Sequence, residues 1–360
     1  MTAPETMAST PVAASLGALV LEARGLCKDY RIGRGPGSST VSAVRDVSLQ
    51  LRRGSVVALV GESGSGKSTV AKLLAGQEWP TAGQILLDGE PVRPSSRHAF
   101  RAFKSDVQMV FQDPFASLNP THRVRYPLER AVRLHQRELK GAAIGAELVR
   151  LLEEVRMIPA EQFLMRYPHE LSGGQRQRIS IARALAVKPR VLLADEPVSM
   201  LDVSIRLEVL DVIDQLRARF DLAVLYITHD IASARYFANE TLVMYAGEIV
   251  ERGPSEDLTQ NPAHPYTQLL LAAAPDPDRL GAPVDERLKL GGRPVAGTSA
   301  RTAGCRFSDR CPLAEDRCRA ESPPLRAIGE QRAAACWRLE VAAPGLLADA
   351  GAERSTPMPR

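Results

Sequence analysis

The chain has 360 residues, of which 44% are hydrophobic and 24% charged, with a formal net charge of +4. This composition is ordinary for a soluble globular protein, and the length allows one large domain or two to three smaller ones. The weak, scattered positive charge does not predict a nucleic-acid partner. No apolar run approaches the roughly 20 residues that span a bilayer. The first 17 residues lack Lys and Arg, so a disordered tail is expected and not a signal peptide.

Strands alternate with helices over most of the chain. Strands are expected at 18–30 and 41–51, on either side of a Gly/Pro/Ser loop, and the apolar run 55–61 is typical of a buried central strand. A glycine-rich loop and a helix at 68–77 follow. Further strands are expected at 84–90, 106–112, 190–197, 222–230, 241–247 and 248–253, and further helices at 176–187 and 204–220. This alternation predicts an α/β fold with a mainly parallel sheet.

Three stretches differ in character. Residues 121–170 are rich in Arg, Glu and Leu with helical periodicity, which predicts a helical insertion. Pro, Gly and Asp become dense around 254–300, as in a linker, with one helix expected at 264–274. A short Cys-bearing segment and a Pro/Ala-rich tail from about 343 complete the chain.

Residues 61–69 read GESGSGKST and fit the phosphate-binding pattern G-x-x-x-x-G-K-[ST]. The glycines let backbone N–H groups turn toward phosphate oxygens, and the following helix adds its positive N-terminal end. Lys67 supplies a charge for the β- and γ-phosphates, and Ser68 a hydroxyl for Mg²⁺. Downstream, VLLADE ends a predicted buried strand in two carboxylates. Asp195 is expected to hold Mg²⁺ through water, and Glu196 to polarise the attacking water.

A second candidate phosphate-binding element reads LSGGQRQR and lies more than a hundred residues later. Ser172, Gly173 and Gly174 precede a helix that is expected to start near Arg176, which forms an anion site at a helix N-terminus. The alternative interpretation is a helix-capping Ser-Gly turn.

These motifs resemble those of the ATP-binding subunit of an ABC transporter, over roughly residues 18–255. In the family's order they are the Walker A loop GESGSGKST, the Q-loop residue Gln112, the signature LSGGQ, the Walker B strand VLLADEP, the D-loop SMLD and the His switch ITHD. The resemblance implies an ABC-type P-loop ATPase with a mainly parallel core sheet, an antiparallel β subdomain, a helical subdomain and a small C-terminal Cys-rich module. The expected divisions are a disordered tail at 1–17, the cassette at 18–255 with its helical subdomain at about 113–175, a linker at 256–300, the Cys-rich module at 301–342 and a disordered tail at 343–360.

The resemblance also assigns roles residue by residue. ATP would be bound by Tyr30 stacking on adenine, Gly61, Ser63, Gly64, Gly66, Lys67, Ser68, Thr69 and Gln112. Mg²⁺ would be held by Ser68, Gln112 and Asp195, and catalysis would use Glu196, His229 and Lys67. Two cassettes pair head to tail in this family, so Ser172, Gly173, Gly174 and Gln175 would serve the partner's ATP and Asp202 would reach across the dimer. Met200 departs from the small residue that is more usual beside that seam.

Two further stretches narrow the resemblance to the oligopeptide/dipeptide importer group, which also includes nickel and oligosaccharide importers. They are FQDPFASLNP (111–120) and NPAHPYTQLLLAAAPDPD (261–278). The expected partners are a second ATP-binding subunit, two transmembrane permease subunits and, indirectly, an extracytoplasmic substrate-binding protein, with the chain peripheral on the cytoplasmic face of the cell membrane. A soluble ABC ATPase acting on DNA or ribosomes is the rival. The insertion lacks the sustained heptads expected of the DNA-repair members, and the chain has a single cassette.

Four of the five cysteines, Cys305, Cys311, Cys318 and Cys336, lie within the last 56 residues. In a cytosolic chain, metal explains such a cluster better than disulfides. No short C-x₂-C pair of the kind usual in a zinc ribbon is present, and four thiolates suit an iron–sulfur cluster. The importer group includes members with a [4Fe–4S] cluster on a similar pattern, so that cluster is the favoured expectation, with zinc, free thiols or disulfides as alternatives.

Overall fold

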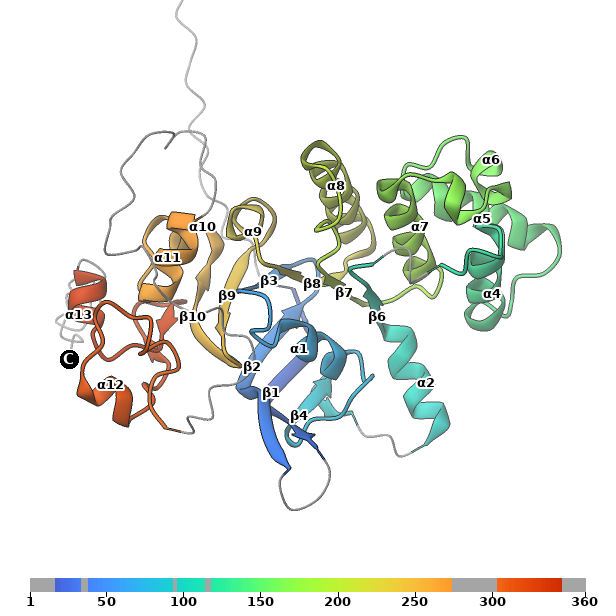
Figure 1. Ribbon diagram of the computed structural model, residues 1–360. Coiled ribbons are helices and arrows are strands. Elements are labelled where there is room, and N and C mark those ends of the chain that lie inside the picture. The colour runs from blue at the N-terminus through green and yellow to red at the C-terminus, as the bar shows by residue number, and fades with distance from the viewer. Residues whose placement is uncertain (1–16, 34–37, 93–95, 114–117, 274–302, 345–360) are drawn as a thin grey trace, which may run out of the picture.

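The computed structural model of the chain describes residues 17–33, 38–92, 96–113, 118–273 and 303–344. The two predicted tails therefore lie almost entirely outside the described residues, and so does most of the predicted linker. Figure 1 shows the described elements gathered around a central sheet, with the helices of residues 125–185 (α4–α7) at one end and residues 303–344 at the other.

The central sheet has eight strands in the order β11-β12-β10-β9-β3-β8-β7-β6. The pairs β9/β3, β3/β8, β8/β7 and β7/β6 are parallel, and the pairs toward β11 are antiparallel. β3, β7 and β8 are buried along their whole length, as their apolar runs predict. The bounds are β3 Val56–Val60, β6 Val107–Val110, β7 Val191–Asp195, β8 Ala223–Thr228, β9 Glu240–Tyr245, β10 Glu248–Pro254, β11 Arg326–Ala327 and β12 Ala333–Ala334.

A second, antiparallel sheet has the order β2-β1-β4-β5. Its bounds are β1 Leu19–Ile32, β2 Ser39–Arg52, β4 Ala82–Leu87 and β5 Glu90–Pro91. Apolar residues of β1 and β2 pack with β3 and α1 (Lys67–Leu74) in one core. The expected antiparallel β region is thus present, and it covers one face of the central sheet.

The predicted insertion is helical. It contains α4 (Arg125–His135), α5 (Ala142–Glu154), α6 (Ala160–Met165) and the 3₁₀ turn η1 (Pro168–Glu170), which precede α7 (Gly173–Leu185). Leu128, Leu148 and Leu152 bury the apolar faces of these helices in the core shared with β7 and β8. The other helices are α2 Arg97–Asp106, α8 Val203–Phe220, α9 Ile231–Phe237, α10 Ser255–Gln260, α11 Pro265–Ala273, α12 Asp316–Ala320 and α13 Leu339–Ala342.

Residues 303–344, here called the C-terminal segment, continue the central sheet (Figure 1). β12 pairs with β10 through Glu251 and Arg252, and β11 pairs with β12. Glu251 is fully buried, accepts backbone N–H groups of Ala263 and His264, and pairs with Arg332 at 3.1 Å. Sequence periodicity did not indicate this junction, because β11 and β12 have two residues each. Within the described ranges, every helix is too short or too polar to cross a membrane.

Candidate ATP-binding and hydrolysis site

Four parallel neighbouring strands, in the order β3-β8-β7-β6, end at one edge of the central sheet. The phosphate loop, residues 61–69, follows β3. His229 follows β8, Glu196 follows β7, and Gln112 comes two residues after β6. Because carboxyl ends of parallel strands meet at one edge, segments far apart in the sequence deliver their polar residues to one place.

The phosphate loop is folded around Lys67. The Lys67 ammonium donates to the carbonyls of Gly61 at 2.7 Å and Glu62 at 2.9 Å. Burial lowers the pKa of Lys67, while Glu196 and Asp195 oppose that shift. Gly61 and Gly66 permit close backbone approach, since an added Cβ would lie 2.2 Å from the Met244 carbonyl oxygen and 2.4 Å from that of Ala43, respectively. Gly66 also has φ of 105°, which favours glycine.

Groups that could hold a magnesium ion lie beside this loop. The Ser68 hydroxyl donates to Asp195 at 3.1 Å. Burial raises the pKa of Asp195, and the Ser68 hydrogen bond opposes this. A hydroxyl and a carboxylate at this separation are hard oxygen ligands of the kind that Mg²⁺ prefers.

Glu196 is held between two predicted site residues. Its Oε2 accepts Gln112 Nε2 at 3.1 Å and lies 3.4 Å from His229 Nδ1. Its backbone has φ of 45°, which is uncommon for a residue with a side chain, and its N–H donates to Ile227 at 2.9 Å. The structure therefore brings Lys67 and Asp195 together with Glu196 and the groups that orient it, an arrangement suited to phosphoryl transfer to water.

Tyr30 lies near the loop but is engaged locally. Its hydroxyl donates to Glu78 at 2.5 Å, and Lys28 Nζ lies 5.1 Å from its ring centroid. Burial, followed by the Glu78 hydrogen bond, raises the Tyr30 pKa to about 12. Ser63 and Gly64 are exposed on the loop, and Thr69 is half-buried. The adenine-stacking role of Tyr30 stays a prediction.

The signature element forms a capped helix start. Ser172 Oγ accepts the Gln175 N–H at 3.3 Å, and Gln175 Oε1 accepts the Ser172 N–H at 3.0 Å, which is a complete capping box. α7 consequently begins at Gly173, earlier than the expected start near Arg176. Gly174 is required by packing, since a Cβ there would lie 2.6 Å from Ile205 Cγ2 on α8. The capping turn and the predicted anion site occupy the same residues.

Two residues of the D-loop, Met200 and Asp202, lie at the surface. Asp202 precedes α8 and is exposed, and the Met200 side chain is 58% exposed. Between them, Leu201 packs against the signature, since a Cβ on Gly173 would lie 3.1 Å from its Cδ2. The position of Met200 and Asp202 near a dimer seam stays a prediction.

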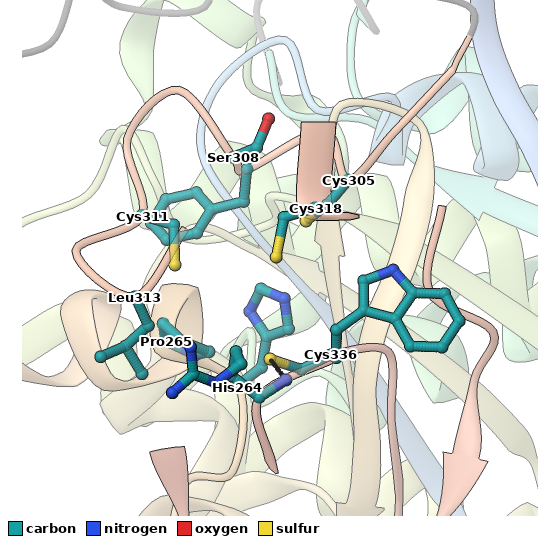
Figure 2. A pocket seen from close by; sticks show the side chains of 11 residues that line it. His264, Pro265, Cys305, Ser308, Cys311, Leu313, Cys318 and Cys336 are labelled. Atoms are coloured by element: carbon teal, nitrogen blue, oxygen red, sulfur yellow. Dashed lines mark hydrogen bonds between the residues drawn. The ribbon is translucent and has the colours of Figure 1, made fainter. Parts of the chain in front are cut away.

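The four C-terminal cysteines line one cavity together with His264, Phe307 and Trp337 (Figure 2). None is disulfide-bonded in the described residues. Burial raises the pKa of Cys305, Cys311 and Cys336 to about 11 in each case, and neighbouring cysteines add to each shift. Among the described residues, no group of three or more His, Cys, Asp or Glu side chains is arranged to hold a metal ion. Because no such group is present in the described ranges, the iron–sulfur expectation stays a prediction.

Sequence patterns missed Tyr266 and Arg310, both of which contact Glu62 in the phosphate loop. The motif HPYTQ drew attention to the segment containing Tyr266, but it gave no indication of the contact.

Comparison with known proteins agrees with the fold. Residues 44–199 match the family described as ABC transporter, and residues 250–318 match the Oligopeptide/dipeptide transporter, C-terminal region. The chain is 41% identical over 325 residues to the Di/tripeptide transport ATP-binding protein DppF of Pseudomonas aeruginosa (strain UCBPP-PA14), covering 89% of this chain and 98% of that protein. It is 41% identical over 328 residues to the Probable peptide ABC transporter ATP-binding protein y4tS of Sinorhizobium fredii (strain NBRC 101917 / NGR234), covering 88% and 89%.

Among solved structures, the ATP-binding cassette MJ0796, a dimer in a post-hydrolysis state bound to ADP and Pi, superimposes with a TM-score of 0.58. It shares 26% identity and covers 65% of this chain and 98% of its own. The fold and site thus define an ATP-hydrolysing cassette. The chain belongs to the ABC transporter ATP-binding proteins that carry the oligopeptide/dipeptide transporter C-terminal region.

Proposed function

We propose that this chain is the ATP-hydrolysing subunit that powers uptake of oligopeptides or dipeptides through an ABC importer. The observation that carries the proposal is the convergence of Lys67, Asp195, Glu196 and His229 at one sheet edge, in a chain that continues into the oligopeptide/dipeptide C-terminal region. The peptide cargo comes from the names of the relatives, a di/tripeptide transport protein and a probable peptide transporter.

In the proposed reaction, Lys67 leaves its two loop carbonyls for the phosphates. Ser68 and Asp195, with Gln112, would hold Mg²⁺, which would supply positive charge to offset the charge that develops on the phosphoryl group. Glu196 polarises the attacking water, because it already faces two groups that orient its carboxylate. His229 reaches toward the same space and keeps Glu196 in place.

The signature, the second phosphate-binding element, is proposed to contact ATP that is bound by a partner subunit. Ser172 is exposed and Gly173 and Gln175 are half-buried at the start of α7, and the solved relative MJ0796 is a dimer. We propose that Ser172, Gly173, Gly174 and Gln175 complete the ATP site of a second ATP-binding subunit, in a heterodimer or a homodimer, with Asp202 reaching across. ATP then closes the pair and hydrolysis reopens it.

A groove of about 620 Å³ between the central sheet and the helical region offers a place for the permease. Its lining includes the exposed side chains of Phe111, Tyr126 and Leu134, with Arg130 between them. Exposed large apolar groups in a groove are typical of a contact with another protein. We propose that the two transmembrane subunits insert cytoplasmic helices here, one into each cassette, which places the chain on the cytoplasmic face of the membrane. A substrate-binding protein outside the cell is then an indirect partner.

The cysteine cavity is proposed to hold a [4Fe–4S] cluster with a structural role. Four unpaired thiols reach it from different parts of a segment with little regular structure, and its other walls include apolar rings, as in Figure 2. A single zinc ion needs sulfurs about 2.3 Å from one point, whereas a cluster accepts a wider ring of thiolates. Bound iron would replace protons that the buried thiols otherwise retain.

Anaerobic purification with iron, sulfide and zinc analysis tests this site. Iron and sulfide that disappear in the Cys311→Ser/Cys318→Ser variant would support a cluster. Colourless protein with stoichiometric zinc, or iron content unchanged in that variant, would contradict it.

Co-purification tests the function. Two multi-span membrane proteins that accompany the full-length chain would support the importer, and ribosomes or DNA in their place would contradict it. Uptake of labelled dipeptides, Ni²⁺ and oligosaccharides in a deletion strain then separates the peptide proposal from the two cargo alternatives.

A further inference from the structure

Glu62, the second residue of the phosphate loop, is held by residues that lie more than 200 positions later in the chain. Its backbone N–H donates to the Tyr266 hydroxyl at 2.9 Å. Arg310 donates from Nη1 and Nη2 to the two Glu62 carboxylate oxygens, both at 2.8 Å. Tyr266 lies on α11, and Arg310 lies in the C-terminal segment between Cys305 and Cys311. Two independent elements therefore contact the same residue of the ATP site.

Both contacting side chains are fixed by an aromatic cluster. Tyr245 lies 4.6 Å from Tyr266 and 5.3 Å from Phe307 between ring centroids, and Tyr266 lies 5.5 Å from Phe307. The Arg310 guanidinium lies 5.7 Å from the Tyr245 ring and 5.8 Å from the Phe307 ring, and its side chain is 13% exposed. A planar guanidinium that is stacked and bidentate has little freedom to move.

The position of Glu62 matters for phosphate binding because its carbonyl accepts the Lys67 ammonium at 2.9 Å. A shift of the Glu62 backbone would therefore move the loop that holds Lys67 before ATP binds and that presents its N–H groups to the phosphates. The Glu62 carboxylate also stands in the phosphate loop, where an unpaired negative charge would repel ATP. Arg310 neutralises that carboxylate and restrains it at the same time.

We propose that Tyr266 and Arg310 are positioning residues for the phosphate loop, through which the C-terminal residues set the affinity of the cassette for ATP. The inference goes beyond the transport function, since it depends neither on the cargo nor on what fills the cysteine cavity. Under this proposal the C-terminal segment affects nucleotide binding and also extends the central sheet through β11 and β12.

Calorimetric titration of the full-length chain with MgATP tests the proposal. Arg310→Met should weaken binding by about tenfold, because it strands the Glu62 carboxylate beside the phosphates. Glu62→Gln changes no residue of the C-terminal segment and should weaken binding by about threefold. The double variant should bind no more weakly than Arg310→Met alone, since both changes act through one contact. Additive losses in the double variant would overturn the proposal.

Further measurements separate positioning from a general loss of structure. Arg319→Met is the matched control, because Arg319 lies in the same segment and pairs with Asp316 at 3.4 Å, half exposed. It should leave MgATP affinity unchanged. Tyr266→Phe, which keeps the ring, should weaken MgATP binding severalfold because the Glu62 N–H loses its hydrogen-bond acceptor.

In the assembled complex Arg310→Met should raise KM for ATP more than it lowers kcat. A lowered melting temperature with unchanged affinity in both the Arg310→Met and Tyr266→Phe variants would reduce these residues to structural anchors and end the inference.

Discussion

The two phosphate-binding regions of this chain differ in how much each can do alone. The phosphate loop is folded around a buried Lys67, and its neighbours Asp195 and Glu196 come from the same sheet edge. The signature has an exposed Ser172, and its capping box already satisfies the Ser172 and Gln175 N–H groups within the chain. A site with its own cation and carboxylates is suited to bind nucleotide within one chain. The helix N-terminus at the signature has the Arg176 Nε 3.5 Å from the Ser172 carbonyl oxygen, and it is suited to add donors to a nucleotide that another chain holds.

The largest effect should come from the hydrolytic carboxylate of the first region. Glu196→Gln keeps the shape and a hydrogen-bonding group but cannot polarise water as a carboxylate does. We expect turnover in the assembled complex to fall about 100-fold or more while MgATP binding persists. The matched control is Glu256→Gln, since Glu256 pairs with Arg235 on the surface and lies outside the proposed site. Turnover close to that of the unmodified complex would refute the assigned role.

The two regions also use glycine for different reasons, and alanine substitutions should separate them. Gly66→Ala places a Cβ against the rigid Ala43 carbonyl at φ of 105°, so we expect about 2 kcal/mol or more of lost stability. Gly174→Ala meets only the Ile205 methyl, which can shift, so we expect a loss of about 1 kcal/mol. Denaturant unfolding measures both.

The control for this pair is a second substitution on α8. In an Ile205→Ala background the clash at Gly174 is gone, and alanine is the better helix former, so Gly174→Ala should become neutral or stabilising. A loss that persists in that background would mean that Gly174 is required for a reason other than its contact with Ile205.

Much of the phosphate-loop site was predictable because short, continuous sequence motifs supply its residues. A glycine loop between a buried strand and a helix, and two carboxylates at the end of another buried strand, are enough to predict Lys67 and Asp195 as site residues. The ABC fold was likewise predicted from motif order. The sheet order β3-β8-β7-β6, which brings His229 and Gln112 to Glu196, depends on pairings that no local pattern encodes.

The connections of the C-terminal segment were not predictable for a similar reason. Arg310 and Glu62 are separated by 248 positions, and β12 has two residues, too few for any periodicity. The capping box at Ser172 shows a different limit. The sequence allowed both a capping turn and an anion site. The structure shows the capping turn, and the anion site stays a prediction.

A substitution at Ser172 can separate those two roles. Ser172→Asp keeps an N-cap acceptor for the Gln175 N–H but places a negative charge where the partner's phosphate is proposed to lie. We expect association with the second ATP-binding subunit in MgATP to weaken about tenfold or more, measured by sedimentation in the Glu196→Gln background. MgATP binding to the isolated chain should stay within about twofold, because Lys67 and its neighbours are untouched.

Ser172→Asn is the matched control, since it caps the helix without adding charge and should retain most of the association. If the Ser172→Asp and Ser172→Asn variants associate equally well, the signature meets no phosphate of a partner and is a capping turn alone.

The smallest expected effect concerns the base of the nucleotide, at the far end from the phosphates. The Tyr30 ring has Lys28 Nζ 5.1 Å from its centroid, and its hydroxyl is tied to Glu78. If adenine stacks on this ring, the affinity for MgATP depends on the ring and not on the hydroxyl. Tyr30→Phe should therefore change MgATP affinity by less than about twofold, and Tyr30→Ala should weaken it about fivefold, the loss of one stacking contact.

Inorganic triphosphate has no base, so its binding should be the same in both variants. A loss of triphosphate affinity in Tyr30→Ala would show that Tyr30 supports the phosphate loop instead, and equal losses of MgATP affinity in both variants would assign the effect to the Glu78 hydrogen bond.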